Sequence, residues 1–405
     1  MTLLPEPWLK QLEQVLKANI LDFWMKHTLD AKNGGFVGEI DNQMNVVEGA
    51  EKSLVLNARI LWAFASAYRI YKQPEYLEMA DRAYAYLMEH FADKTNGGFY
   101  WMVDAQGVPS QTKKQVYGQA FVIYALAEYH HAAGREEALN TAAGLFETLE
   151  KYAYDPVHHG YIEALAADWS PTEDLSLSAK DMNVKKSMNT HLHVLEGYTG
   201  LYRVYPNDAL RGKLTLLTEI MIDRIIDDKG RHFHLFQDDD WTVKSDIVSY
   251  GHDIEGSWLL VEAAEVLGGE DLLERARKVA ITMAEATLEE GLDGDGGLRN
   301  EMEAHGLVDR NNDWWPQAEA VVGFYNAYQL TGEARFRDAA AASWNFIEEH
   351  IIDREFGEWY WAVDEHRRPL ANAPKVSAWK CPYHNSRACY EMIRRLKETE
   401  LEGAQ

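Results

Sequence analysis

The sequence predicts an all-α protein in which six helix hairpins form a ring, with short β-strands in the loops at one end. Two observations lead to this prediction. A glycine-containing segment recurs along the 405 residues, and stretches with the periodicity of a helix lie on both sides of each copy. The helices before and after the copies also differ in character, which indicates one outer and one inner helix in each repeat.

The recurring segment places a glycine turn before a short stretch of alternating apolar and polar residues, such as the FVGEID that starts at Phe36. Successive copies are 63, 62, 70, 67 and 60 residues apart. So short an alternation predicts a half-buried strand, and glycine supplies the tight turn. The marker glycines are Gly35, Gly98, Gly160, Gly230, Gly297 and Gly357.

Apolar residues recur at i, i+3, i+4 and i+7 between the turns, which predicts twelve helices. Helices charged on one face precede the turns, at 7–28, 75–92, 136–153, 208–226, 270–289 and 334–351. Helices that are apolar on most sides, and therefore more buried, follow them at 52–71, 114–133, 182–205, 249–267, 312–331 and 378–397. No proline- or serine-rich linker separates the repeats, so residues 1–405 are expected to form a single domain.

Composition limits the partners. With 40 basic and 65 acidic side chains the net charge is -25, which disfavours nucleic acid. No apolar run is long enough to span a membrane, and no targeting signal is visible, so the cytoplasm is the expected location. Cys381 and Cys389 lack the spacing of a zinc site and indicate no disulfide framework. The 13 tryptophans fit either helix packing or stacking on a sugar.

Large polar and aromatic side chains gather near the predicted starts of all six inner helices. Helix caps use small residues, whereas these are His, Arg, Glu, Tyr and Trp. Buried polar groups are costly unless they bond to one another or to a ligand, so the sequence predicts a polar pocket on the ring axis. The candidate pocket residues are Arg59, Tyr117, Asn189, His193, His252, Glu255, Trp315, Glu319, Trp379 and His384.

Helical spacing sorts these candidates further. Asn189, His193 and Glu196 share one helix face, whereas His191 lies about 200° from His193 around the helix, which disfavours a metal site built on that pair. His252 and the carboxylate of Glu255 are three residues apart, a spacing at which a carboxylate can orient an imidazole.

Five longer segments are distinctive: NARILWAFASAYR at 57–69, NTHLHVLEGYTGLYR at 189–203, GHDIEGSWLL at 251–260, DWWPQAEA at 313–320 and WKCPYHNSR at 379–387. Through these segments the chain resembles the N-acylglucosamine 2-epimerase superfamily over nearly its whole length. It implies an (α/α)6 barrel and epimerisation at C2 of the reducing-end glucose of cellobiose and related disaccharides, with neither a metal nor another cofactor.

The resemblance also implies roles for the pocket residues. His252 and His384 would be the general acid/base pair, and His193 would assist ring opening or hold the sugar. Arg59 would stabilise the charge of the enediolate, and Glu255 would orient His252. The residues implied to line the sugar site are Tyr117, Asn189, Trp315, Glu319 and Trp379.

The chemistry suits these residue types, because histidine exchanges protons near neutral pH and a guanidinium stabilises an oxyanion. Other functions stay open. A mannose 2-epimerase or an aldose–ketose isomerase would use a similar pocket, a glycoside hydrolase could pair Glu255 with Glu319, and a carbohydrate-binding protein would need only the aromatic residues. The expected partner is a small sugar, with the protein a monomer or a homodimer.

Overall fold

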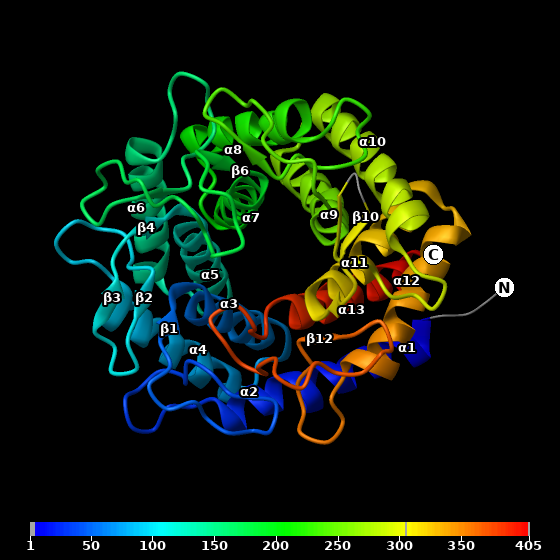
Figure 1. The fold of residues 1–405 in the computed structure, drawn as a ribbon, viewed down its shortest axis with the longest axis horizontal. Helices are drawn as coiled ribbons and strands as arrows, with labels where there is room; N and C mark the ends of the chain where they lie inside the picture. The colour runs from blue at the N-terminus through cyan, green and yellow to red at the C-terminus, as the bar shows by residue number, and fades with distance from the viewer. Residues whose placement is uncertain (1–4, 304–305, 404–405) are drawn as a thin grey trace.

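The computed structural model describes residues 5–303 and 306–403, and its helices form two concentric sets around a central axis (Figure 1). The inner set contributes one helix from each repeat, as predicted. Its members are α3 (Leu54–Tyr71), α5 (Val116–Ala133), α7 (Met188–Val204), α9 (Tyr250–Leu267), α11 (Trp314–Thr331) and α13 (His384–Gly403).

The outer set alternates with the inner set along the chain, which confirms the six predicted hairpins. Several outer helices contain or end in a π-helical turn, labelled η. The outer elements are α1 (Pro5–Gln14) with η1 (Val15–Leu21) and α2 (Asp22–His27), α4 (Pro74–Tyr86) with η2 (Leu87–Phe91), α6 (Glu136–Tyr152), α8 (Asp208–Ile220) with η3 (Met221–Ile225), α10 (Glu270–Ala286) with η4 (Thr287–Gly291), and α12 (Ala334–Phe346) with η5 (Ile347–Ile351).

The two sets differ in burial as their sequences predict. Every side chain of α3 from Leu54 to Ala67 is buried, because α3 packs against neighbours on most sides. Helix α10 instead buries one stripe that includes Ala276, Ala280 and Met283, and its charged residues face outward. None of the helices among the described residues has the length and apolarity needed to cross a membrane.

Short antiparallel strands lie in the loops at one end of the ring, where the inner helices begin. A two-residue strand immediately precedes each of α3, α5, α7, α9 and α11 and pairs with a strand from the following repeat. The sheets are β1 (Lys52–Ser53) with β2 (Met102–Val103) and β3 (Pro109–Gln111), β4 (Lys114–Gln115) with β5 (Ala164–Leu165), β6 (Lys186–Ser187) with β7 (Phe236–Gln237), β8 (Val248–Ser249) with β9 (Glu301–Glu303) and β10 (Gly306–Asp309), and β11 (Asn312–Asp313) with β12 (Ala362–Val363).

Buried ion pairs join several glycine turns to the inner helices that follow them. In each pair an aspartate just after an outer helix also accepts hydrogen bonds from the backbone of its turn, and a lysine reaches it from the segment that leads to the next inner helix. The pairs are Asp30–Lys52 at 2.8 Å, Asp93–Lys114 at 2.7 Å, Asp155–Lys186 at 2.9 Å and Asp353–Lys375 at 2.5 Å. These pairs tie each of these turns to the segment that leads to the following inner helix.

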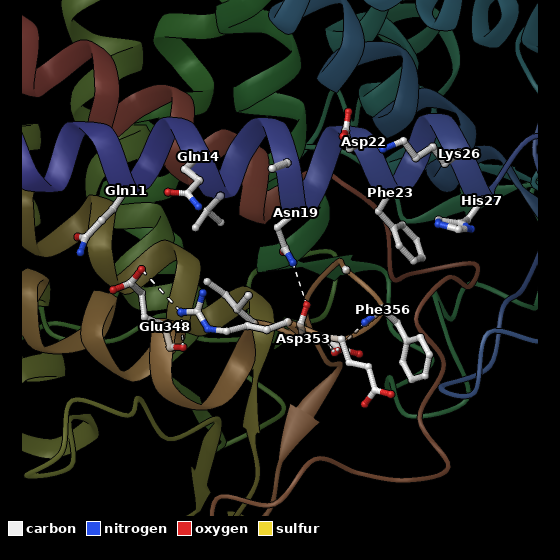
Figure 2. A pocket seen from close by; sticks show the side chains of 16 residues that line it. Gln11, Gln14, Asn19, Asp22, Phe23, Lys26, His27, Glu348, Asp353 and Phe356 are labelled. Atoms are coloured by element: carbon white, nitrogen blue, oxygen red, sulfur yellow. Dashed lines mark hydrogen bonds and ion pairs between the residues drawn. The ribbon is translucent and has the colours of Figure 1, made fainter.

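The first outer segment closes the ring against the last repeat. Figure 2 shows Asn19, from the N-terminal segment, pointing toward Asp353, and its Nδ2 donates to the Asp353 carbonyl at 2.9 Å. The Glu358 N–H donates in turn to the Asn19 carbonyl at 2.9 Å. On the inner side, the Tyr390 hydroxyl of α13 donates to the Ala63 carbonyl of α3 at 2.9 Å.

Two predicted inner helices begin too early. Residues 182–187 are a loop and β6 rather than the start of α7, because Lys186 and Ser187 pair with β7. Residues 378–383 are bent rather than helical, and α13 starts only after Pro382, which cannot donate a backbone hydrogen bond.

Candidate functional site

The same hydrogen-bond arrangement recurs at the start of several inner helices. A polar side chain in the first turn bonds to the backbone N–H that follows the glycine turn of its own repeat. Thus Gln119 accepts from Phe99, His191 from Tyr161, Asp253 from Phe233 and Gln317 from Leu298, at 2.9, 2.9, 2.9 and 2.7 Å. Two positions further along each helix stand Phe121, His193, Glu255 and Glu319, and in the first and last repeats the corresponding residues are Arg59 and Arg387.

A cavity of about 500 Å³ lies where the six inner helices begin, and each of them contributes to it. Nine of the ten candidate residues line this cavity, and Glu319 does not. Its lining residues are Arg59, Tyr117, Leu177, Ser178, Ala179, Lys180, Asp181, Asn189, His193, His252, Glu255, Asp313, Trp314, Trp315, Trp361, Trp379 and His384.

Each of the three cavity histidines is held through its Nδ1 atom. His193 Nδ1 lies 2.9 Å from Glu196 Oε2, and His384 Nδ1 lies 2.7 Å from Glu319 Oε1. His252 Nδ1 lies 2.8 Å from the hydroxyl oxygen of Ser249. An ionised carboxylate only accepts, so the Nδ1 atoms of His193 and His384 carry the proton and their Nε2 atoms stay available.

Trp315 lies against the rings of both His252 and His384. Its ring centroid is 4.7 Å from that of His252 and 5.5 Å from that of His384. The two imidazoles come from different inner helices, α9 and α13, so the indole sets the space between them. A sugar that stacks on Trp315 would therefore lie close to both histidines.

Arg387 holds the carboxylates behind the histidines. Its Nη2 atom lies 2.5 Å from Glu255 Oε1 and 2.6 Å from Glu319 Oε1, and its Nη1 atom donates to Glu196. The guanidinium also lies over the ring of Trp258, at 4.9 Å from its centroid. One buried cation therefore links carboxylates from three inner helices, α7, α9 and α11.

Two glutamates lie differently from what the sequence predicts. The Glu255 carboxylate contacts Arg387, and His252 is hydrogen-bonded to Ser249 instead. Glu319 is not among the residues that line the cavity. It lies behind His384 and accepts from that ring, from Arg387 and from Trp258 Nε1 at 3.1 Å. The i, i+3 spacing of His252 and Glu255 allows such a contact, but the spacing cannot show that Arg387 pairs with both carboxylates.

Arg59 is buried, 3% exposed, and among the described residues no carboxylate lies within ion-pair distance of it. Its Nη2 atom donates to the Tyr117 hydroxyl at 2.8 Å, and its guanidinium lies over the rings of Phe121 and Tyr383 at 4.2 and 4.8 Å. A buried cation without a counter-ion is costly, so this guanidinium is suited to an anion that forms in the cavity.

Burial governs the charge state of the cavity histidines. Burial lowers the pKa of His252 to about 3, with a further contribution from His193. The pKa of His384 lies well below its ordinary value because of burial and of Arg59 and Arg387, and burial also lowers the pKa of His193. All three are therefore neutral at pH 7 in the empty cavity, and a negative charge on a bound sugar would raise their pKa values.

His191 and His193 diverge, as their spacing predicts. His191 is buried outside the cavity, with Nδ1 at 2.7 Å from the Ser187 carbonyl and Nε2 accepting the Tyr161 N–H. Among the described residues, the one cluster with metal-ligand geometry is Glu255, Glu319 and His384. The Arg387 guanidinium lies against both of these carboxylates.

Several lining residues were missed by the sequence analysis. Trp361 lies 4.8 Å from Trp314 between ring centroids, and both line the cavity beside Trp315. The loop of residues 177–181 covers another part of the cavity. Asp313 also lines it, and burial raises the pKa of this carboxyl to about 7. The tryptophans belonged to motifs already quoted or to strand-like stretches, but no pattern distinguished cavity residues from packing residues.

A second hollow, of about 410 Å³, lies on the outer side of the ring between the N-terminal helices and the loop after η5 (Figure 2). Its lining combines Gln14, Lys26 and Glu348 with the apolar Phe23 and Phe356. None of the candidate site residues reaches it, and the chemistry of the site belongs to the central cavity.

Known proteins are similar to this chain in sequence and in fold. The family described as N-acylglucosamine 2-epimerase matches residues 34–388. A cellobiose 2-epimerase of Bacteroides fragilis is 43% identical over 385 residues, which cover 95% of this chain and 98% of the relative.

Two solved structures are similar throughout. The cellobiose 2-epimerase of Bacillus thermoamylovorans has a TM-score of 0.92 at 38% identity, covering 96% of this chain and 99% of its own. The cellobiose 2-epimerase of Spirochaeta thermophila has a TM-score of 0.89 at 41% identity, and the match covers 97% of this chain and 98% of the other. These similarities confirm the predicted (α/α)6 ring.

Proposed function

The chain belongs to the N-acylglucosamine 2-epimerase family and is a carbohydrate epimerase, and on that premise we propose its substrate and mechanism. The reaction is inversion at C2 of the reducing-end glucose of cellobiose and related β-1,4-linked disaccharides, which gives glucosyl-mannose. The observation that carries the proposal is the pair of cavity imidazoles, His252 and His384, which both lie against the ring of Trp315.

The reaction begins with opening of the sugar ring, which exposes the C1 aldehyde and acidifies the proton on C2. His193 lies in the cavity beside Tyr117, with ring centroids 5.0 Å apart, and assists this step or holds the open chain. Tyr117, Asn189, Trp315 and Trp379 bind the sugar. The loop of residues 177–181 gives room for contacts with the second ring of a disaccharide.

One histidine then takes the C2 proton on its Nε2 atom and leaves a cis-enediolate. The other histidine takes up a proton from solvent on its Nε2 atom as the negative charge develops, and gives it to the opposite face of C2, so that the C2 configuration inverts. Running the reaction in reverse exchanges the two roles. Arg59 stabilises the oxyanion, and Glu319 and Glu196 orient His384 and His193 from behind.

Incubation with cellobiose in deuterated water tests the proposal. The expected product is glucosyl-mannose with deuterium at C2. Free glucose would indicate a glycoside hydrolase, a 2-ketose would indicate an aldose–ketose isomerase, and mannose formed only from free glucose would indicate a monosaccharide epimerase. His252→Ala and His384→Ala should each abolish turnover while the helical circular dichroism signal is retained. Substantial activity in either variant would remove that histidine from the acid/base pair.

We also propose that the 405 residues act as one catalytic domain, because all six inner helices contribute to the cavity. The protein would work as a monomer or a homodimer in the cytoplasm. Both cysteines are unpaired and buried, as suits a reducing compartment. Analytical ultracentrifugation of the active protein measures the oligomeric state.

A further inference from the structure

Serine precedes three of the inner helices, and two of these serines act as ordinary helix caps. The Ser53 hydroxyl accepts the Leu56 N–H at 2.9 Å, and the Ser187 hydroxyl accepts the Thr190 N–H at 3.1 Å. Each therefore satisfies the backbone donor three residues into its helix, which is the usual role of serine at this position.

Ser249 occupies the same position before α9, but its hydroxyl caps no backbone donor in the part of the chain that the structure describes. Its oxygen instead lies 2.8 Å from Nδ1 of His252, the residue whose N–H it would otherwise cap. Ser249 is 2% exposed, and its backbone is fixed by pairing with Glu301 of β9. The serine is therefore held rigidly and directed to the imidazole.

No other hydrogen bond holds the His252 side chain among residues 5–303 and 306–403. Glu255, one turn further along α9, is engaged by Arg387, and Trp315 contacts the imidazole through its ring. The ionisable groups that influence His252 are His193 and Glu319, which act on its charge and not on its tautomer. The choice of tautomer at His252 therefore depends on Ser249.

We propose that Ser249 is a positioning residue for the acid/base chemistry, an inference that rests on the proposed function. Its oxygen accepts the Nδ1 proton of His252, so that the Nε2 lone pair faces C2 of the sugar. A hydroxyl, unlike the carboxylates behind His193 and His384, does not stabilise an imidazolium strongly. His252 is thus the neutral base in one direction of the reaction and gives its proton back in the other, whereas His384 has a carboxylate to support its protonated form.

The first test compares Ser249→Ala with Ser187→Ala. Ser249→Ala should lower kcat on cellobiose by about 10-fold or more, a part of what general acid–base catalysis contributes, with KM and melting temperature nearly unchanged. Ser249→Thr, which keeps the hydroxyl, should restore most of the rate. Ser187→Ala removes a true cap, so it should lower the melting temperature and leave kcat within about twofold. A wild-type kcat in Ser249→Ala would overturn the inference.

Two further readouts separate positioning from a general structural effect. Ser249→Asp places a carboxylate at Nδ1, so the acid-side midpoint of the kcat–pH profile should move to higher pH. Nitrogen-15 NMR should show the Nδ1–H tautomer of His252 in the wild type and a mixture in Ser249→Ala. An Nε2–H tautomer in the wild type would refute the inference whatever the activity. A wild-type protein that incorporates no deuterium would contradict the proposed function, while the NMR result would still decide the role of Ser249.

Discussion

The Arg59 guanidinium bonds to the Tyr117 hydroxyl, 2.8 Å from its Nη2 atom, and to no carboxylate among the described residues. Its Nε atom is buried and has no hydrogen-bond partner within residues 5–303 and 306–403. Arg387, the other buried arginine of the ring centre, is surrounded by three glutamates. The fold thus contains one neutralised and one unneutralised arginine a short way apart, and the two should respond differently to mutation.

Arg59→Met should impair catalysis without weakening the fold. Loss of one oxyanion-stabilising donor lowers kcat by about 10²- to 10³-fold. The melting temperature should stay the same or rise, because the substitution removes a buried charge that lacks a counter-ion. Steady-state kinetics on cellobiose and a thermal melt check both outcomes. A melting temperature several degrees lower would show that the stacking on Phe121 and Tyr383 outweighs the cost of burying the charge.

Arg387→Met should instead destabilise the whole ring. It leaves the carboxyls of Glu196, Glu255 and Glu319 buried without their shared cation, and breaking such a network costs about 3–5 kcal/mol. Urea unfolding at pH 7 measures the loss. An unchanged free energy of unfolding would mean that these carboxyls take up protons readily when the guanidinium is absent.

The buried ion pairs that join a turn to a helix should contribute far more to the free energy of unfolding than exposed ion pairs with similar N–O distances. Both side chains of the Lys114–Asp93 pair are fully buried, at 2.7 Å, whereas the Lys26–Asp22 pair at 2.8 Å is 63% and 41% exposed. Lys114→Met should therefore lower the free energy of unfolding by about 3–5 kcal/mol. Lys26→Met should change it by less than about 1 kcal/mol. Equal effects in urea titrations would contradict a structural role for the buried pair.

The fold was predictable because local sequence features, namely glycine turns and two kinds of helix, define the repeat. The starts of the helices predicted at 182 and 378 were not predictable, because they depend on pairing with β7 and on the bend around Pro382. Neither constraint changes the periodic apolar pattern of the sequence.

Which residues line the cavity was largely predictable from the sequence, but their contacts with one another were less so. Nine candidates line the cavity because polar side chains at the start of a buried helix need a common partner. Which carboxylate serves which histidine depends on contacts between helices far apart in the sequence, such as Arg387 with Glu255. Spacing within one helix therefore could not show that the Glu255 carboxylate contacts Arg387.

His191 shows how a side chain that accepts the backbone N–H after a glycine turn can make stability depend on pH. Its Nε2 atom accepts the Tyr161 N–H and its Nδ1 atom donates to the Ser187 carbonyl, so only the neutral ring fits. Burial lowers its pKa from 6.5 to about 4. Between these values the unfolded chain binds a proton that the folded protein does not, so this contribution to stability is complete above pH 6.5 and is lost as the pH falls toward 4.

His191→Gln should remove that pH dependence while keeping the hydrogen bond to the Tyr161 N–H, because Gln119 and Gln317 accept the equivalent N–H groups in other repeats. At pH 7.5 the variant and the wild type should have similar free energies of unfolding. Below pH 6.5 the free energy of unfolding of the variant should rise relative to that of the wild type by roughly 1.4 kcal/mol per pH unit, until the folded wild type also binds the proton. Urea titrations at pH 7.5, 5.5 and 4.5 measure the difference. A difference that stays constant over this range would show that folding leaves the pKa of His191 unchanged.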